Sequence, residues 1–177
     1  MQFLNFYFEY IVKYDLINKF NYNTINQIPK FTSIILNFNY KNVKQSFSIL
    51  LISNILLYKN SKIIKANTTN LSLKIQKGDP ILLQIVLTNK NLINLFLLKL
   101  LLQLNFNYKQ LNISKPKKFV SSKKSFLFTI KKSLVFPEIE KNFKFFNNLV
   151  DSQIIILTNT KTSNELIFLL KTYKFPL

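Results

Sequence analysis

Hydrophobic and polar positions alternate with a period of two in residues 30–38 (KFTSIILNF), and the β-branched and aromatic side chains there favour a strand. The alternation gives this strand two different faces, with Ile34, Leu36 and Phe38 on one and Phe31, Ser33, Ile35 and Asn37 on the other. The pattern ends there, so the strand is expected to end near Asn37.

Helical periods fill four other segments. Residues 3–20 mix aromatic and polar side chains at roughly helical spacing and predict an N-terminal helix, followed by a turn that contains Pro29. Apolar side chains recur at helical spacing from Val43 to Leu57 and predict a second helix. Residues 91–104 are apolar almost all round, which predicts a largely buried helix. Thr162 and Glu165 have the spacing of a capping box and predict the start of a C-terminal helix.

The remaining periodic segments predict five further strands, at residues 62–66, 71–76, 81–88, 125–130 and 153–158. The order is therefore helix, strand, helix, three strands, helix, basic loop, two strands and helix. This order favours an α+β fold, a mainly antiparallel sheet with helices packed against it. A chain of 177 residues suits a single domain spanning residues 1–177, with the basic segment 105–125 as an excursion from it.

The only glycine, Gly78, lies between two of the predicted strands in the stretch KIQKGDP. A hairpin turn often needs a positive φ, which glycine adopts without steric cost, and Pro80 restricts the residue before it. Lys74 and Lys77 flank the glycine, so the turn is interpreted as a basic hairpin tip. The alternative is that Gly78 only closes a hairpin and that the lysines are solvated.

Positive charge adds a functional constraint to this fold. The chain has 25 lysines, no arginine and 7 acidic residues, a formal net charge of +18. From Leu16 to Pro137 the only acidic side chain is Asp79, against 19 lysines. The abundance of Asn, Lys, Ile and Phe is typical of an AT-rich genome and indicates an organelle-encoded protein, but codon bias does not account for the scarcity of acids. A polyanionic partner such as RNA is the physical interpretation.

Residue types needed for most chemistry are missing. Cysteine and histidine are both absent, which excludes disulfides, the commonest zinc ligands and thiol nucleophiles. One glycine cannot build a phosphate-binding loop, and no paired acids suit acid–base catalysis. We therefore expect no enzyme activity, catalytic residue, metal, cofactor or small-molecule substrate. The apolar stretches are shorter than the roughly 20 residues of a spanning helix, so membrane insertion is not expected.

Residues 115–132 (KPKKFVSSKKSFLFTIKK) combine seven lysines with Phe119, Phe126 and Phe128. Lysines with interleaved aromatic rings suit phosphates and stacked bases of RNA. The alternative is a solvated charged loop that enters a strand whose phenylalanines face the core. We expect the core role for the phenylalanines and the RNA role for the lysines.

Four collinear segments resemble one protein family: FNYNTINQIPKFTSIILNF (residues 20–38), LKIQKGDP (73–80), LVFPEIE (134–140) and KTYKFPL (171–177). The chain resembles the bacterial-type large-ribosomal-subunit protein number five, the uL5 family, from about Tyr10 to Leu177. The resemblance implies an α+β protein of the central protuberance that binds 5S rRNA and adjacent rRNA. It also implies neighbours among the large-subunit proteins, the elbow of the P-site tRNA and a head protein of the small subunit. A mitochondrial ribosome is the expected location, with a plastid or an AT-rich bacterium as alternatives.

The resemblance assigns Asn37 to the RNA-contacting surface and Lys74, Lys77 and Gly78 to a hairpin near tRNA. The rRNA-binding residues that we expect are Asn37, Lys30, Lys65, Lys115, Lys117, Lys118, Lys123 and Lys124. The chain departs from the family pattern where Lys59 replaces a glutamine, Leu73 an aromatic residue and Val86 a threonine. It also lacks the family's glycines around residues 105–125. These departures leave open whether 5S rRNA or only other rRNA is bound.

A rival function from a different class is a basic peripheral membrane or scaffold protein of an organelle, which would use the apolar helices. Salt distinguishes the two functions. Phosphate contacts make affinity fall steeply with salt, whereas apolar insertion is nearly independent of it.

We predict that replacing Lys117, Lys118, Lys123 and Lys124 with glutamine weakens RNA binding without unfolding the domain, because these cations are expected to contact phosphates. RNA titration and circular dichroism measure the two effects. An unchanged affinity in the folded quadruple variant would remove this loop from the RNA surface.

Overall fold

Five strands form one antiparallel sheet in the computed structural model, which describes residues 3–39, 43–72, 74–106, 124–130, 136–142, 146 and 151–175. Their order across the sheet is β2-β3-β1-β5-β4. The strands are β1 (Phe31–Asn39), β2 (Lys62–Lys65), β3 (Pro80–Leu87), β4 (Ser125–Ile130) and β5 (Ser152–Thr158). β1, the first strand in the sequence, is therefore the central one. The α+β fold with an antiparallel sheet is confirmed.

Alternation along the strands separates a buried face from a half-buried one. Ile34, Leu36 and Phe38 of β1 are almost fully buried, as predicted for one face of this strand. They pair in register with buried residues of β3 and β5, for example Leu36 with Ile85 and Ile154. This buried face forms the floor of the hydrophobic core.

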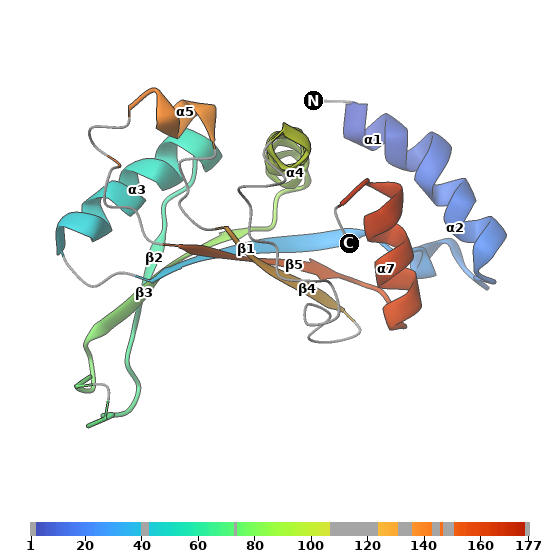
Figure 1. The fold of residues 1–177 in the computed structure, drawn as a ribbon. Coiled ribbons are helices and arrows are strands. Elements are labelled where there is room, and N and C mark those ends of the chain that lie inside the picture. Colours follow the sequence, from blue (N-terminus) through green and yellow to red (C-terminus); the bar gives the residue numbers. More distant parts are fainter. Residues whose placement is uncertain are drawn as a thin grey trace.

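The helices lie on the buried face of the sheet, above it in Figure 1. α3 (Val43–Leu57) and the short α5 (Pro137–Glu140) cover one end, α4 (Lys90–Phe106) crosses the middle, and α7 (Ser163–Thr172) covers the other end with the N-terminal helix. Their core side chains include Ile52 of α3, Phe96 of α4 and Leu169 of α7, each fully buried. An ion pair of 2.8 Å between Lys99 and Glu138 joins α4 to α5. Burial raises the pKa of the Glu138 carboxyl, but its hydrogen bonds to Lys99 and to the backbone and the charges of Lys99 and Lys141 together outweigh burial and hold this pKa below its ordinary value.

The N-terminal helix is continuous from Phe3 to Lys19 but changes its winding. It consists of α1 (Phe3–Tyr7), a π-helical turn (Phe8–Val12) and α2 (Lys13–Lys19). Leu4, Phe8, Val12 and Leu16 bury one side of it in the core. The hydroxyl group of Tyr7 donates to the carbonyl of Thr172 at 2.8 Å, and its ring meets Tyr173 edge to face. The N-terminal helix is therefore packed against the end of α7. Burial raises the pKa of Tyr173.

Three expectations need correction. The predicted strand at residues 71–76 does not form: this segment contains turns and one isolated bridge between Asn70 and Ile75. The short α5 was not predicted, because four residues that begin with Pro137 carry no helical period. α4 was expected to be largely buried, yet Leu98 and Leu102 are exposed, since a helix resting on a sheet turns one side to solvent.

The capping box of α7 is partly confirmed. The Thr162 side chain accepts a hydrogen bond from the Glu165 N–H at 3.3 Å, as the spacing predicted. The Glu165 carboxylate reaches back to the N–H of Lys161 at 2.9 Å, one residue earlier than in the usual motif. Two backbone donors at the start of α7 are thereby satisfied.

We predict that Thr162→Ala lowers the free energy of unfolding by about 1 kcal/mol, because it leaves the Glu165 N–H without its cap. Urea denaturation measures this, and Ser163→Ala, one residue into the helix, is the matched control with a much smaller effect. Equal losses in the two variants would contradict the assignment of Thr162 as the cap.

Candidate nucleic-acid interface

The second face of the sheet carries no helix of the described part of the chain (Figure 1). Side chains on this open face alternate with the core residues and are half-buried, for example Ile35 and Asn37 of β1. No helix or strand of the described residues forms a second layer over them. A strand face that is neither core nor fully solvated is available to a partner.

One polar side chain from every strand lies in register across this open face. The Cα pairings link Lys62 to Gln84, Gln84 to Asn37, Asn37 to Gln153, and Gln153 to Thr129. We call these five residues the polar row. Cross-strand partners lie about 5 Å apart, so the row extends across the sheet for about 20 Å.

Asn37 stands at the centre of the polar row. Its carboxamide oxygen accepts a hydrogen bond from the Gln84 side-chain nitrogen at 3.1 Å. This bond orients the Asn37 amide and uses one of its lone pairs. The other lone pair and both N–H donors have no hydrogen-bond partner among the described residues, so they are available to base edges, ribose or phosphate.

An apolar row runs beside the polar row on the same face. Val86, Ile35, Ile155 and Leu127 pair in register and are all half-buried. Aliphatic side chains of this kind offer a flat surface to sugars and bases. The open face therefore combines directed hydrogen bonding with a neighbouring apolar strip.

Lysines gather at the edge of the sheet that β2 and β3 form. Five of them occur within residues 59–79: Lys59, Lys62, Lys65, Lys74 and Lys77. The Lys59 ammonium group donates to the Val86 carbonyl at 2.6 Å. This bond satisfies a β3 carbonyl just beyond the residues that pair with β2. Lys62, Lys65, Lys74 and Lys77 are exposed. The acid in this segment, Asp79, is engaged, because its carboxylate accepts from the Gln76 N–H at 2.7 Å.

The connection between β2 and β3 projects from the body of the protein, at the lower left of Figure 1. Gly78 has φ +94°, which confirms the expected positive φ. Its position differs from the expectation: Gly78 donates to the Ala66 carbonyl at 2.9 Å and lies at the base of the projection. Further out, the Lys74 N–H donates to the Leu71 carbonyl at 3.2 Å, Lys74 also has a positive φ, and Leu71 is 93% exposed.

The expected site residues fall at opposite ends of the sheet. Asn37, Lys65, Lys74, Lys77 and Gly78 lie at the end that carries the β2–β3 connection. Lys30 and Lys124 lie at the other end, where the carbonyl of Lys30 accepts from Asn159 and that of Lys124 accepts from Thr158. Lys30 also places its ammonium group 5.7 Å from the Phe8 ring, toward the helix layer. The structure therefore does not join these two lysines to Asn37.

The remaining expected residues, Lys115, Lys117, Lys118 and Lys123, lie outside the described residues. Sequence reasoning missed the other four members of the polar row, namely Lys62, Gln84, Gln153 and Thr129. Each occupies an alternate position in its strand, which is a visible signal, but their alignment depends on register. No group of acids that could hold a metal ion occurs in the described part of the chain. In the same part, every helix is too short or too polar to cross a bilayer.

Known proteins with similar sequences share one description. The chain is 33% identical to "Large ribosomal subunit protein uL5m" of Reclinomonas americana, an alignment that covers all of this chain and 98% of that protein. It is 30% identical to "Large ribosomal subunit protein uL5" of Wigglesworthia glossinidia brevipalpis over 99% of this chain and 98% of that one. The Thermosipho africanus protein with this description is 27% identical over 96% of the chain. No family model matches the chain.

Proposed function

Because the chain belongs to the uL5 family of large ribosomal subunit proteins, we propose that its open sheet face and lysine-rich β2–β3 edge form an rRNA-binding surface. The family membership makes the chain a structural, non-enzymatic component of the large subunit that serves translation. The similarity to uL5m supports the mitochondrial ribosome as its location.

The observation that carries the proposal is the polar row beside the lysine-rich edge. Lysines attract phosphates without regard to sequence, and carboxamides form directed hydrogen bonds to bases and sugars. Asn37 pairs with Gln84, and Gln84 pairs with Lys62 on the edge strand β2. Asn37 is therefore two strands away from the lysine-rich edge. An RNA backbone held along the edge brings its bases over the open face.

The finer placement rests on the family resemblance. We place the chain in the central protuberance, against 5S rRNA or the adjacent large-subunit rRNA. The β2–β3 connection with Lys74, Lys77 and Gly78 reaches toward the P-site tRNA and a head protein of the small subunit. The projection of this connection beyond the sheet and its exposed lysines support that role.

Two departures from the family pattern meet at the proposed surface. Lys59 and Val86, which stand where the family has a glutamine and a threonine, contact each other through the ammonium and carbonyl groups. In place of the glutamine amide stands the Lys59 ammonium group, which is already bonded to the backbone. In place of the threonine hydroxyl group stands the aliphatic side chain of Val86. The rRNA recognised here is expected to differ in detail from that of bacterial relatives.

A basic membrane-surface or scaffold protein was the rival function. The curated relatives cited above are all large ribosomal subunit proteins. The rival therefore has no observation in its favour and is set aside.

We predict that Lys62→Gln, Lys65→Gln, Lys74→Gln and Lys77→Gln together lower affinity for rRNA fragments and reduce the logarithmic salt slope by about 3, since each phosphate contact contributes about 0.7 to 0.9. Asn37→Ala instead lowers affinity by about fivefold at every salt concentration, because it removes directed hydrogen bonds and no charge. Fluorescence anisotropy over a range of KCl concentrations measures both effects.

The matched control for the lysines is Lys161→Gln with Lys171→Gln, two exposed lysines at or next to α7 in the helix layer. This pair should change the slope much less than the edge lysines do. Equal changes per lysine replaced in the control and edge variants would show that the charge acts diffusely and that the surface is wrongly placed.

We further predict that the chain sediments with the large subunit in a magnesium-containing gradient of mitochondrial lysate and cross-links to rRNA. Sequencing the cross-linked RNA distinguishes 5S rRNA from adjacent large-subunit rRNA. Cross-links to neither, in subunits that contain the chain, would refute the proposed rRNA contact without touching the family membership.

A further inference from the structure

Exposed apolar side chains concentrate on the N-terminal helix. Among the described residues, thirteen large hydrophobic side chains are exposed, and six of these lie between Phe3 and Ile17. Single exposed apolar residues are common on protein surfaces, but a contiguous group marks an interaction site. The opposite side of the same helix is already packed in the core through Leu4, Phe8, Val12 and Leu16, so this exposed group is separate from the core contacts of the helix.

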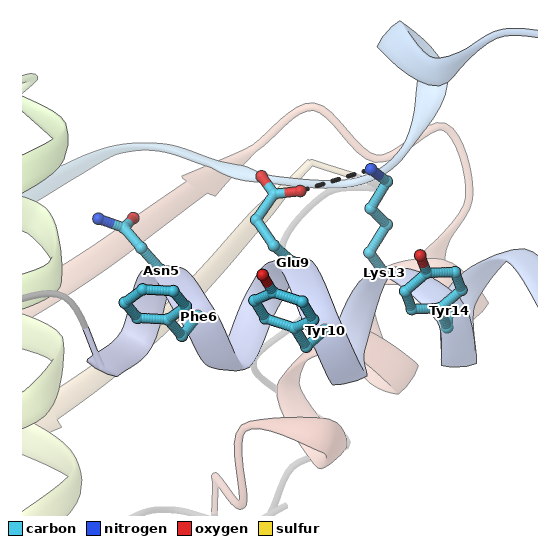
Figure 2. A pocket seen from close by; sticks show the side chains of 6 residues that line it. All are labelled: Asn5, Phe6, Glu9, Tyr10, Lys13 and Tyr14. Carbon is cyan, nitrogen blue, oxygen red and sulfur yellow. Dashed lines mark hydrogen bonds and ion pairs between the residues drawn. The ribbon is translucent and has the colours of Figure 1, made fainter.

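Three aromatic side chains of this group stand in a straight line. Figure 2 shows Phe6, Tyr10 and Tyr14 in one row along the helix, which we call the aromatic stripe. Their exposed fractions are 52%, 70% and 57%, and the rings of Phe6 and Tyr10 stack at 5.9 Å between centroids. The stripe is thus a pre-ordered apolar ridge about two turns long.

The π-helical turn at Phe8–Val12 keeps the stripe straight. In an α-helix, two residues four apart overshoot a full turn by about 40°, so a row of such residues winds around the axis. A π turn takes more residues per revolution and opposes this drift. The π-helical winding therefore contributes to the alignment of the aromatic stripe.

A second row beside the stripe is polar. Asn5, Glu9 and Lys13 lie parallel to it in Figure 2, and a shallow hollow is lined by the residues of both rows. Glu9 and Lys13 form an ion pair of 3.4 Å, and Asn5 accepts a hydrogen bond from Asn94 of α4 at 2.8 Å. Two parallel rows with a hollow between them are the surface into which the side-chain ridge of another helix fits.

The charge of this helix argues for a protein partner. Residues 3–19 contain two acids, Glu9 and Asp15, and two lysines, so their net charge is zero in a chain of +18. Lys19 turns away from the hollow, with its ammonium group 4.1 Å from the Phe168 ring of α7. RNA would meet no excess of positive charge here, and a second copy of the chain would bring another +18 against the first. A membrane-surface helix would carry lysines along its polar face.

We propose that the aromatic stripe is a docking surface for an α-helix of a neighbouring large-subunit protein. That helix presents an aliphatic ridge to the hollow between the two rows and a basic side chain to Glu9. Tyrosine and phenylalanine are enriched in protein interfaces, where rigid rings bury a large area and a phenol keeps its hydroxyl group at the rim. The inference rests on the chain's membership of the large subunit and is independent of where rRNA binds.

Photo-cross-linking in purified, assembled large subunits tests the proposal. A benzophenone amino acid replaces Tyr10 in one variant and Tyr58, which is 74% exposed next to Lys59, in the control variant. Irradiation followed by peptide mass spectrometry should join position 10 to a helical segment of one large-subunit protein. Cross-links from position 10 to rRNA, to lipid, to a second copy or to another part of this chain would overturn the proposal, and so would the absence of any cross-link.

A triple variant supplies a second readout. Phe6→Ser, Tyr10→Ser and Tyr14→Ser together should lower the occupancy of the cross-linked protein in purified subunits by about tenfold, while the melting temperature and rRNA affinity of the free chain stay unchanged. Undiminished occupancy would overturn the proposal. The control at Tyr58 separates the proposed rRNA surface from the proposed docking surface. Under the proposed function, position 58 cross-links to rRNA whatever position 10 contacts.

Discussion

The central position of β1 is the constraint on which the structure depends. This strand pairs with β3 on one side and β5 on the other, so its register fixes which residues of three strands share a face. A slip by one residue would exchange the two faces and bring Asn37 into the core in place of Leu36 or Phe38. Burial of Ile34, Leu36 and Phe38 opposes that slip, and the hydrophobic core thereby holds the polar row on the open face.

Helices cover only one face of the sheet, and this determines which side chains remain on the open face. Apolar side chains of α3, α4 and α7 are buried between the helix layer and the sheet. The open face carries the polar row and a narrow aliphatic row. The lysines of the β2–β3 edge add charge beside it. A fold with helices on both faces would bury Asn37 and Gln84, at the cost of two carboxamides that would need partners there.

Charge is distributed unevenly over this scaffold. The N-terminal helix is neutral, although the chain as a whole carries +18. The lysine-rich edge and the aromatic stripe lie on different parts of the molecule, at opposite sides of Figure 1. Such a separation suits a protein that holds RNA on one surface and another protein on a second one.

The sequence by itself determined the fold class and most of the elements, and its charge predicted a polyanionic partner. Period-two and helical patterns place β1, β3, β4, β5 and the long helices, because each of these buries one regular face. A segment without a buried face was misread: residues 71–76 alternate in sequence, but the described residues there form turns and an isolated bridge between Asn70 and Ile75 instead of a strand. Only the tertiary structure decided that Asn37 aligns with Gln84 and Gln153, that Lys30 and Lys124 lie far from it, and that Phe6, Tyr10 and Tyr14 form a line. Register and helix winding arise from contacts between residues distant in the chain, and no local pattern encodes them.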